Sequence, residues 1–98
     1  MVTELLEIGT DNARSGRELA KVLKCDIREV TAQIERERRA GQPICASMGG
    51  NKAGYYLAES PEELENYCNM LYHRAGALFK TRRALLNVLE QIKKQKEA

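Results

Sequence analysis

The chain has 98 residues, of which 43% are hydrophobic and 31% are charged, and sixteen Lys and Arg against fourteen Asp and Glu give it a formal net charge of +2 at pH 7. This length suits one small domain with a modest core plus an extension, and it excludes a second domain with an active-site cleft of its own. The hydrophobic content excludes a disordered chain, and the small net charge gives no sign by itself of a protein that binds polyanions.

The three cysteines, Cys25, Cys45 and Cys68, are odd in number and lie far apart. The sequence also has no secretory leader pattern and no apolar run of membrane-spanning length. These features favour a reduced, cytoplasmic setting without membrane contact, in which the cysteines are small, partly buried thiols.

Two short helices are predicted near the start of the chain. Apolar residues on one side of residues 2–8 predict the first helix, and Gly9 ends it as a glycine C-cap. Ser15 is the predicted N-cap of a second helix over residues 16–23, because its hydroxyl can accept a hydrogen bond from a free amide of the first turn. Glu18 stands three residues after this serine and completes a capping box.

A third helix is predicted over residues 26–40, with Asp26 as its N-cap. Its apolar residues Ile27, Val30 and Ile34 recur at helical spacing, and a glycine and a proline end it shortly afterwards. The other side of this helix is polar, which predicts that it faces solvent or a partner.

A β-hairpin is predicted next. Residues 43–47 and 54–58 have the composition of short strands, and Gly49-Gly50-Asn51 between them has the composition of a turn. Two strands are unstable alone, so the hairpin must pack on the helices. Because side chains alternate between the faces of a strand, we expect only one of Tyr55 and Tyr56 to lie in the core.

The last predicted helix starts at Ser60 and Pro61, which fit the N-cap and first helical positions, and runs to about residue 96. It would be roughly 50 Å long, which is more than a globular part of this size can cover. Along it, mainly apolar residues recur by alternating steps of four and three, the heptad pattern of a coiled coil. These residues are Leu64, Cys68, Leu71, Ala75, Leu78, Arg82, Leu85, Leu89 and Ile92.

We therefore expect residues 1–58 to form one globular domain and residues 59–98 to form a long helix that pairs two copies as a coiled coil. The expected dimer contacts are Leu71, Ala75, Leu78, Arg82, Leu85, Leu89 and Ile92. Arg82 is a polar residue within an apolar stripe, and such residues select register or oligomeric state at some cost in stability. The sequence leaves open whether this helix pairs with a second copy or binds another protein.

The predicted elements follow one another in the order helix, helix, turn, helix, hairpin, and residues within them match those of a known module. They are Ser15-Gly16-Arg17-Glu18-Leu19-Ala20, Val30, Ile34, Gly41, Pro43-Ile44 and Gly54-Tyr55-Tyr56-Leu57. With them, residues 1–58 resemble the winged helix-turn-helix module at the N-terminus of biotin-protein ligase repressors and of many small bacterial and phage regulators. The resemblance implies a mainly α fold with a small β-hairpin wing, and it implies binding to double-stranded DNA.

Three sites depart from the pattern of that module. Arg14 stands where an aliphatic residue is usual, Lys24-Cys25 replaces a turn of glycine and an aliphatic residue, and Glu37 occupies a site usually filled by leucine. We expect Glu37 and Arg38 to find partners across the base of the third helix or toward the last helix. The sequence does not choose between these.

The third helix is expected to enter the major groove of DNA, because an α-helix fits that groove and its first turns can reach base edges. Candidate base contacts are Arg28, Thr31, Ala32 and Gln33, and Arg36 on the same helix is a further candidate DNA contact. Candidate phosphate contacts are Ser15, Arg17, Asn51 and Lys52. Arg28 suits a bidentate contact to guanine, and Ala32 is small enough for close approach.

Structural roles are the alternative for these charged residues. Arg28 has alternative partners in Asp26, Glu29 and Glu35. Arg36 can join ion pairs within its helix. A second basic stretch on the last helix is either a set of added phosphate contacts or a solvated face. It comprises His73, Arg74, Lys80, Arg82 and Arg83.

The sequence predicts neither a catalytic nor a metal centre. It has one histidine, His73, and its cysteines lack the close spacing of zinc ligands. Cys68 lies five positions before His73 and so on another face of the helix, which excludes a nucleophile and base pair. The glycines at 49 and 50 lack the lysine and helix of a phosphate-binding loop. We therefore expect no enzyme, no cofactor and no small-molecule substrate.

Two functions fit these observations. The first is a dimeric DNA-binding protein, either a transcriptional regulator or a phage-type accessory factor, that uses residues 26–40 of each subunit. The second is a protein interaction module for replication or phage assembly, without direct DNA contact. The placement of Arg17, Arg28 and Lys52 favours the first, and the glutamates of the third helix favour the second.

Overall fold

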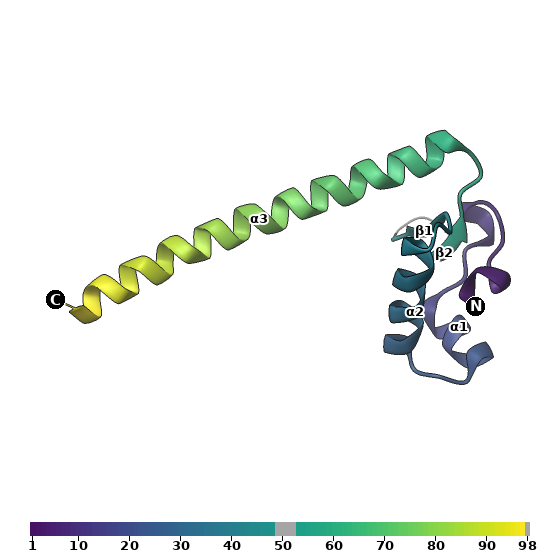
Figure 1. Cartoon of the computed structure of the whole chain (residues 1–98), viewed down its shortest axis with the longest axis horizontal. Helices are drawn as coiled ribbons and strands as arrows, with labels where there is room; N and C mark the ends of the chain where they lie inside the picture. The colour runs from purple at the N-terminus through teal and green to yellow at the C-terminus, as the bar shows by residue number, and fades with distance from the viewer. Residues whose placement is uncertain (49–52, 98) are drawn as a thin grey trace. The chain divides into compact units, whose positions relative to one another are not determined.

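A computed structural model describes residues 1–48 and 53–97 (Figure 1). The chain is mostly helical with one antiparallel hairpin and a long C-terminal helix, as predicted. Its elements are the 3₁₀ helices η1 (Val2–Leu5) and η2 (Thr10–Asn12), the helices α1 (Gly16–Leu23) and α2 (Ile27–Arg39), the strands β1 (Ile44–Ser47) and β2 (Gly54–Leu57), and the helix α3 (Pro61–Glu97). They form two compact units, Met1–Tyr67 and Cys68–Ala98, which we call the N-terminal unit and the C-terminal unit.

The starts of α1 and α2 are fixed by the two predicted caps. The Ser15 hydroxyl accepts a hydrogen bond from the Glu18 amide at 3.1 Å, and the Asp26 carboxylate accepts one from the Glu29 amide at 2.8 Å. Each cap satisfies an amide that has no partner inside its helix and contributes about 1 kcal/mol. Local sequence therefore determines where both helices begin.

The predicted helix over residues 2–8 is wrong. Only Val2–Leu5 is helical, as a 3₁₀ turn, because the backbone that follows it pairs with β2 instead. The Leu57 amide donates to the Glu7 carbonyl at 2.9 Å, and the Gly9 amide donates to the Leu57 carbonyl at 3.1 Å. Ile8, expected on the apolar side of the helix, is consequently exposed.

The hairpin is joined to the segment before α1 as well as closed on itself. β1 and β2 are antiparallel, with Cys45 opposite Tyr56, and Arg14 exchanges two backbone hydrogen bonds with Tyr55, at 2.9 and 2.8 Å. Gly54 lies beside this junction with φ of +147°, and a β-carbon there would collide with the Arg14 carbonyl oxygen. The close approach therefore requires glycine.

Buried side chains form two clusters, one on each face of the hairpin. The larger consists of Val2, Leu6, Leu19, Ala20, Val30, Ile34 and Ile44, with Tyr55 packed against it. The smaller consists of Ala13, Cys45 and Tyr56, with Leu64 and Tyr67 from the start of α3 packed against it. Tyr56 is buried and belongs to the smaller cluster, whereas Tyr55 is only partly buried, so one of the two tyrosines lies in the core, as expected. The first turns of α3 cover the face on which Tyr56 lies. This packing also explains why the N-terminal unit extends into α3.

The cysteines lie in three different environments. Cys45 is buried and Cys25 is partly buried, as expected, whereas Cys68 on α3 is exposed. Within the described part of the chain, no helix combines the length and the apolar character needed to cross a bilayer.

Candidate nucleic-acid interface

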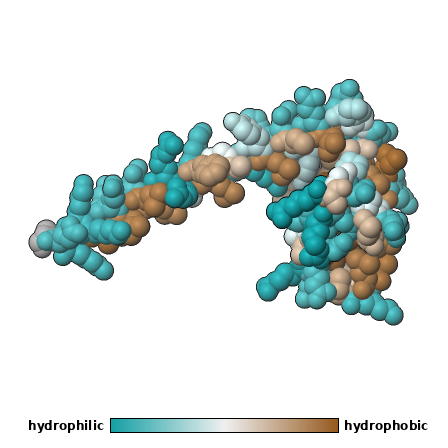
Figure 2. Space-filling model, in the orientation of Figure 1, coloured by the Kyte–Doolittle hydropathy of each residue, from teal (hydrophilic) through white to brown (hydrophobic). Residues whose placement is uncertain are grey.

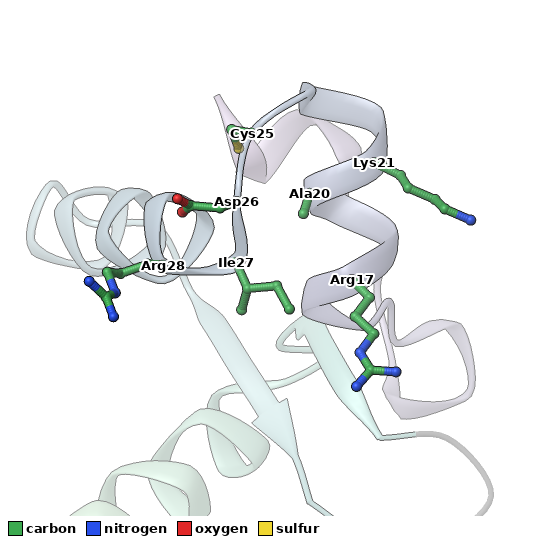
Figure 3. A pocket seen from close by; sticks show the side chains of 7 residues that line it. All are labelled: Arg17, Ala20, Lys21, Cys25, Asp26, Ile27 and Arg28. Atoms are coloured by element: carbon green, nitrogen blue, oxygen red, sulfur yellow. The ribbon is translucent and has the colours of Figure 1, made fainter.

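A shallow groove of about 690 Å³ lies where α1 turns into α2. Its lining residues are Arg17, Ala20, Lys21, Cys25, Asp26, Ile27 and Arg28 (Figure 3). The floor is largely apolar, and Ile27 is 47% exposed there although it belongs to the apolar series of α2. The groove therefore joins an accessible apolar floor to a charged rim.

The basic residues of the rim come from both helices. Figure 3 shows the guanidinium groups of Arg17 and Arg28 at the outer edges of the groove, with Lys21 pointing away from α2. All three side chains are exposed, and no hydrogen bond or ion pair joins any of them to another side chain within residues 1–48 and 53–97. The alternative role for Arg28, an ion pair with a neighbouring carboxylate, is not found among the described residues. These cations are therefore available to an external anion.

Acidic groups also belong to this part of the molecule. Asp26 lines the groove while its carboxylate caps α2. Partial burial raises the pKa of the Cys25 thiol, and the Glu29 carboxylate raises it further. The thiol consequently stays protonated near neutral pH, so this cysteine serves packing and not nucleophilic chemistry.

The turn that shapes the groove is held in a rare backbone conformation. Lys24 ends α1 with φ of +55° and ψ of +47°, in the left-handed region that favours glycine. The Cys25 amide then donates to the Ala20 carbonyl at 3.1 Å, which closes the end of α1. A lysine therefore holds this turn at a cost in backbone energy.

The solvent side of α2 holds the first three predicted base contacts. Arg28, Thr31 and Ala32 are exposed, and the Thr31 hydroxyl donates to the Ile27 carbonyl at 3.0 Å. That bond uses the hydroxyl proton and leaves the oxygen able to accept. Arg28, Thr31 and Ala32 therefore belong to an accessible side of α2.

Gln33 and Arg36 are engaged inside the protein. The Gln33 amide donates to Glu37 at 2.8 Å, and its oxygen accepts from the Arg36 guanidinium at 3.0 and 2.6 Å. Both ends of the Gln33 side chain are thus occupied, and a contact to a base edge would break this chain of bonds. The ion pair of this helix joins Arg38 to Glu35 at 3.0 Å instead of involving Arg36.

Glu37 is the buried centre of a polar network. Its carboxylate, 2% exposed, accepts from the Val2 amide at 2.8 Å and from both the amide and hydroxyl of Thr3, at 2.7 and 2.5 Å. Burial alone would raise the pKa of this carboxyl, but the hydrogen bonds from Thr3, Gln33 and Val2 outweigh it and lower the pKa to about 2. The partners lie across the fold at the start of the chain, which sequence spacing cannot reveal.

Arg38 has a partner on the last helix, which is one of the two arrangements expected from the sequence. Its guanidinium donates to the Ile44 carbonyl at 2.9 Å and to the Tyr67 hydroxyl at 3.0 Å, and it lies 5.3 Å from the centre of the tyrosine ring. This residue therefore fastens the first turns of α3 to α2 and β1.

Of the other predicted phosphate contacts, one caps a helix and two lie outside the described residues. The Ser15 hydroxyl is committed to the cap of α1, where it accepts from the Glu18 amide. Asn51 and Lys52 lie outside the described residues. Within the expected set, Arg17 is thus the phosphate candidate that is both exposed and unpaired in the described structure.

The predicted dimer contacts lie on α3 in the C-terminal unit and are all exposed. We call Cys68, Leu71, Ala75, Leu78, Arg82, Leu85, Leu89 and Ile92 the seam. Beside it runs a flanking column, Tyr72, Phe79 and Leu86, which heptad counting of the seam alone missed although its apolar character is visible in the sequence. Figure 2 shows apolar side chains gathered along one side of this part of α3.

Charge divides unequally between the two units. Residues 1–67 hold nine Lys and Arg against twelve Asp and Glu, whereas residues 68–98 hold seven Lys and Arg against two Glu. The small net charge of the chain therefore conceals an acidic N-terminal unit and a basic C-terminal unit.

Comparisons with protein-family models, with curated proteins and with solved structures find no match to this chain. Within residues 1–48 and 53–97, no three histidine, cysteine or acidic side chains gather as metal ligands would.

Proposed function

We propose that this chain is a DNA-binding protein, a small transcriptional regulator or phage-type accessory factor, whose N-terminal unit is a winged helix-turn-helix. In this proposal α2 enters the major groove, and α1 and the turn before α2 lie against the phosphate backbone. The order of α1, α2 and the hairpin, together with the pairing of Arg14 and Tyr55 beside β2, supports this assignment.

The observation that carries the proposal is the unpaired cationic rim of the groove between α1 and α2. Arg17 and Arg28 project from adjacent helices beside the solvent face of α2. In the proposal, Arg28 meets a base edge from the first turn of α2 and Arg17 meets a phosphate. Arginine suits both tasks, because its planar group donates two parallel hydrogen bonds.

A second function, a protein interaction module, is favoured by the acidic balance of residues 1–67. A unit with more carboxylates than cations is repelled by the phosphates of DNA unless its cations are concentrated at the contact. The apolar floor of the groove, with Ile27 half exposed, is also suited to a protein side chain. The two functions differ in how binding responds to salt.

The test is binding of the full chain to mixed genomic duplex DNA at low and moderate salt. The DNA-binding proposal predicts affinity that falls steeply as salt rises, because bound cations release counterions from the phosphates. Arg28→Ala should weaken binding about tenfold, and Arg17→Ala should also lower the salt slope by about 1.

Arg39→Ala is the matched control. Arg39 is exposed near the end of the same helix and does not line the groove. DNA binding that is absent at low salt would overturn the proposal, provided that circular dichroism shows the protein to be folded. Equal losses in the Arg28 and Arg39 variants would reject the assigned face.

A further inference from the structure

The apolar stripe of α3 is wider than a simple two-column coiled-coil seam. Leu78, Phe79 and Leu85 are 72%, 69% and 63% exposed, and no described residue covers them. Leu64 and Tyr67 already pack in the N-terminal unit, so the uncovered seam begins at Cys68. A sustained stripe of this width on a helix requires a partner.

The seam is complementary to itself when two copies of α3 run in opposite directions. In an antiparallel pair, each position of one heptad column faces a position of the other column. When the start of the uncovered seam in one copy is set opposite its end in the other copy, the facing residues form four kinds of layer. They are Cys68 with Ile92, Leu71 with Leu89, Ala75 with Leu85, and Leu78 with Arg82, each formed twice.

The same register places the flanking columns of both copies on one side of the pair. Phe79 meets Phe79 of the second copy at the centre, and Tyr72 meets Leu86 on either side. This adds a continuous apolar row to the seam. In a parallel pair each flanking residue instead meets the opposite edge of the other helix, and Phe79 meets Arg74.

Charge favours the antiparallel arrangement in two further ways. The flanking column continues to Glu65 before it and Lys93 after it, and these two positions face each other in the antiparallel register. A parallel pair has no such match, and it brings Arg82 against Arg82 in a single layer of the seam. The antiparallel pair separates these like charges and places each against Leu78 of the other copy.

From this we propose that α3 binds a second copy of this chain as an antiparallel two-helix coil centred on Phe79. The overlap from residue 68 to residue 92 is roughly 36 Å long at the rise of an α-helix. It leaves Cys68 of each copy next to Ile92 of the other. The inference goes beyond DNA binding and does not depend on it.

The test is oxidative cross-linking of full-length Ile92→Cys, in which the native Cys68 supplies the other thiol. Cysteines 68 and 92 of one chain lie too far apart on a helix to form a bridge, so the predicted product is a covalent dimer with linkages between position 68 of one copy and position 92 of the other. Peptide mapping identifies the linkage. Cys68→Ser/Ile92→Cys should lose the cross-link, and the wild-type chain should form no bridge between two copies of Cys68.

A parallel pair gives the opposite pattern: bridges between like positions in the wild-type chain and in the double variant. That pattern, or a monomeric wild-type chain in sedimentation under reducing conditions, overturns the proposal.

Charge reversal tests the same register without cysteine chemistry. Glu65→Lys or Lys93→Glu alone should weaken the dimer about fivefold, because each change places like charges together at two symmetric sites. The double variant Glu65→Lys/Lys93→Glu should recover wild-type association. A double variant as weak as the single variants overturns the register, and a tetramer in sedimentation overturns the two-helix arrangement.

Discussion

The two units of this chain use charged and apolar residues in opposite ways. In the N-terminal unit two clusters of apolar side chains are buried, one on each face of the hairpin, and the buried carboxylate of Glu37 has four hydrogen-bond donors. In the C-terminal unit the seam and its flanking column stay exposed. The two buried clusters of the N-terminal unit are therefore covered within one chain, whereas no described residue covers the apolar stripe of the C-terminal unit.

The largest expected effect comes from removing residues 77–98, which separates the two units most directly. Because most of the seam is lost while both buried clusters remain, the shortened chain should be monomeric and still unfold cooperatively. Sedimentation and thermal unfolding check the two parts of this prediction. A shortened chain that sediments as a dimer would locate the contact in the N-terminal unit instead.

Glu37→Ala tests whether the N-terminal unit is held by its polar network. Removing the carboxylate leaves the Val2 amide and both Thr3 donors without their partner, so the free energy of unfolding should fall by about 3 kcal/mol. Urea denaturation measures this change. Glu35→Ala is the control, because that exposed residue makes a surface ion pair worth less than about 1 kcal/mol. Similar losses of unfolding free energy in both variants would show that the Glu37 network contributes no more than a surface ion pair.

The same carboxylate predicts how stability depends on pH. Its pKa is about 2 in the folded chain and 4.5 without these contacts, so its stabilisation is present above pH 4.5 and is lost as the pH falls toward 2. The loss should approach about 3 kcal/mol, measured by denaturation at a series of pH values. In Glu37→Ala this part of the pH dependence should be missing, and an unchanged profile would refute the assignment.

Arg82→Leu sharpens the account of the C-terminal unit. Replacing the charged residue of the seam by an apolar one should tighten self-association about tenfold, at the expense of specificity in helix direction. Sedimentation equilibrium provides the measurement. Arg83→Leu serves as the control, since Arg83 lies outside the seam and flanking column. Weaker association of the Arg82 variant would mean that its charge has a partner across the interface.

The smallest expected effect concerns the turn between α1 and α2. Lys24→Gly should stabilise the N-terminal unit by up to about 1 kcal/mol, because glycine adopts a left-handed conformation without the steric cost of a side chain. Thermal unfolding measures the gain. Lys21→Gly, within α1, should have the opposite sign. Destabilisation by Lys24→Gly would show that the lysine side chain supports the turn.

Features of the fold that depend on neighbouring residues were predictable from the sequence. The caps at Ser15 and Asp26, the hairpin and the start of α3 all follow from local hydrogen bonding and turn preferences. The N-terminal segment was not predictable, because Leu57 draws residues 7–9 into backbone pairing from across the chain. The pattern of neighbouring residues does not reveal backbone pairing with a distant strand.

The candidate site was predictable to the same extent. Arg17 and Arg28 lie exposed on the expected elements, since helix register alone determines their faces. The engagement of Gln33 was not predictable, because it depends on Glu37, whose other partners come from the start of the chain. The width of the α3 stripe was available in the sequence, but counting a single pair of heptad columns conceals it.

The two proposals together describe two identical DNA-binding units joined by a symmetric contact between α3 helices. Selection of bound sites from random DNA duplexes tests this arrangement most directly, because a two-fold protein binds related half-sites in opposite orientation. The account predicts enrichment of inverted repeats, and Arg28→Ala should relax the preference at one position of each half-site. A pool with no enriched sequence, from protein that is folded and dimeric, would contradict it.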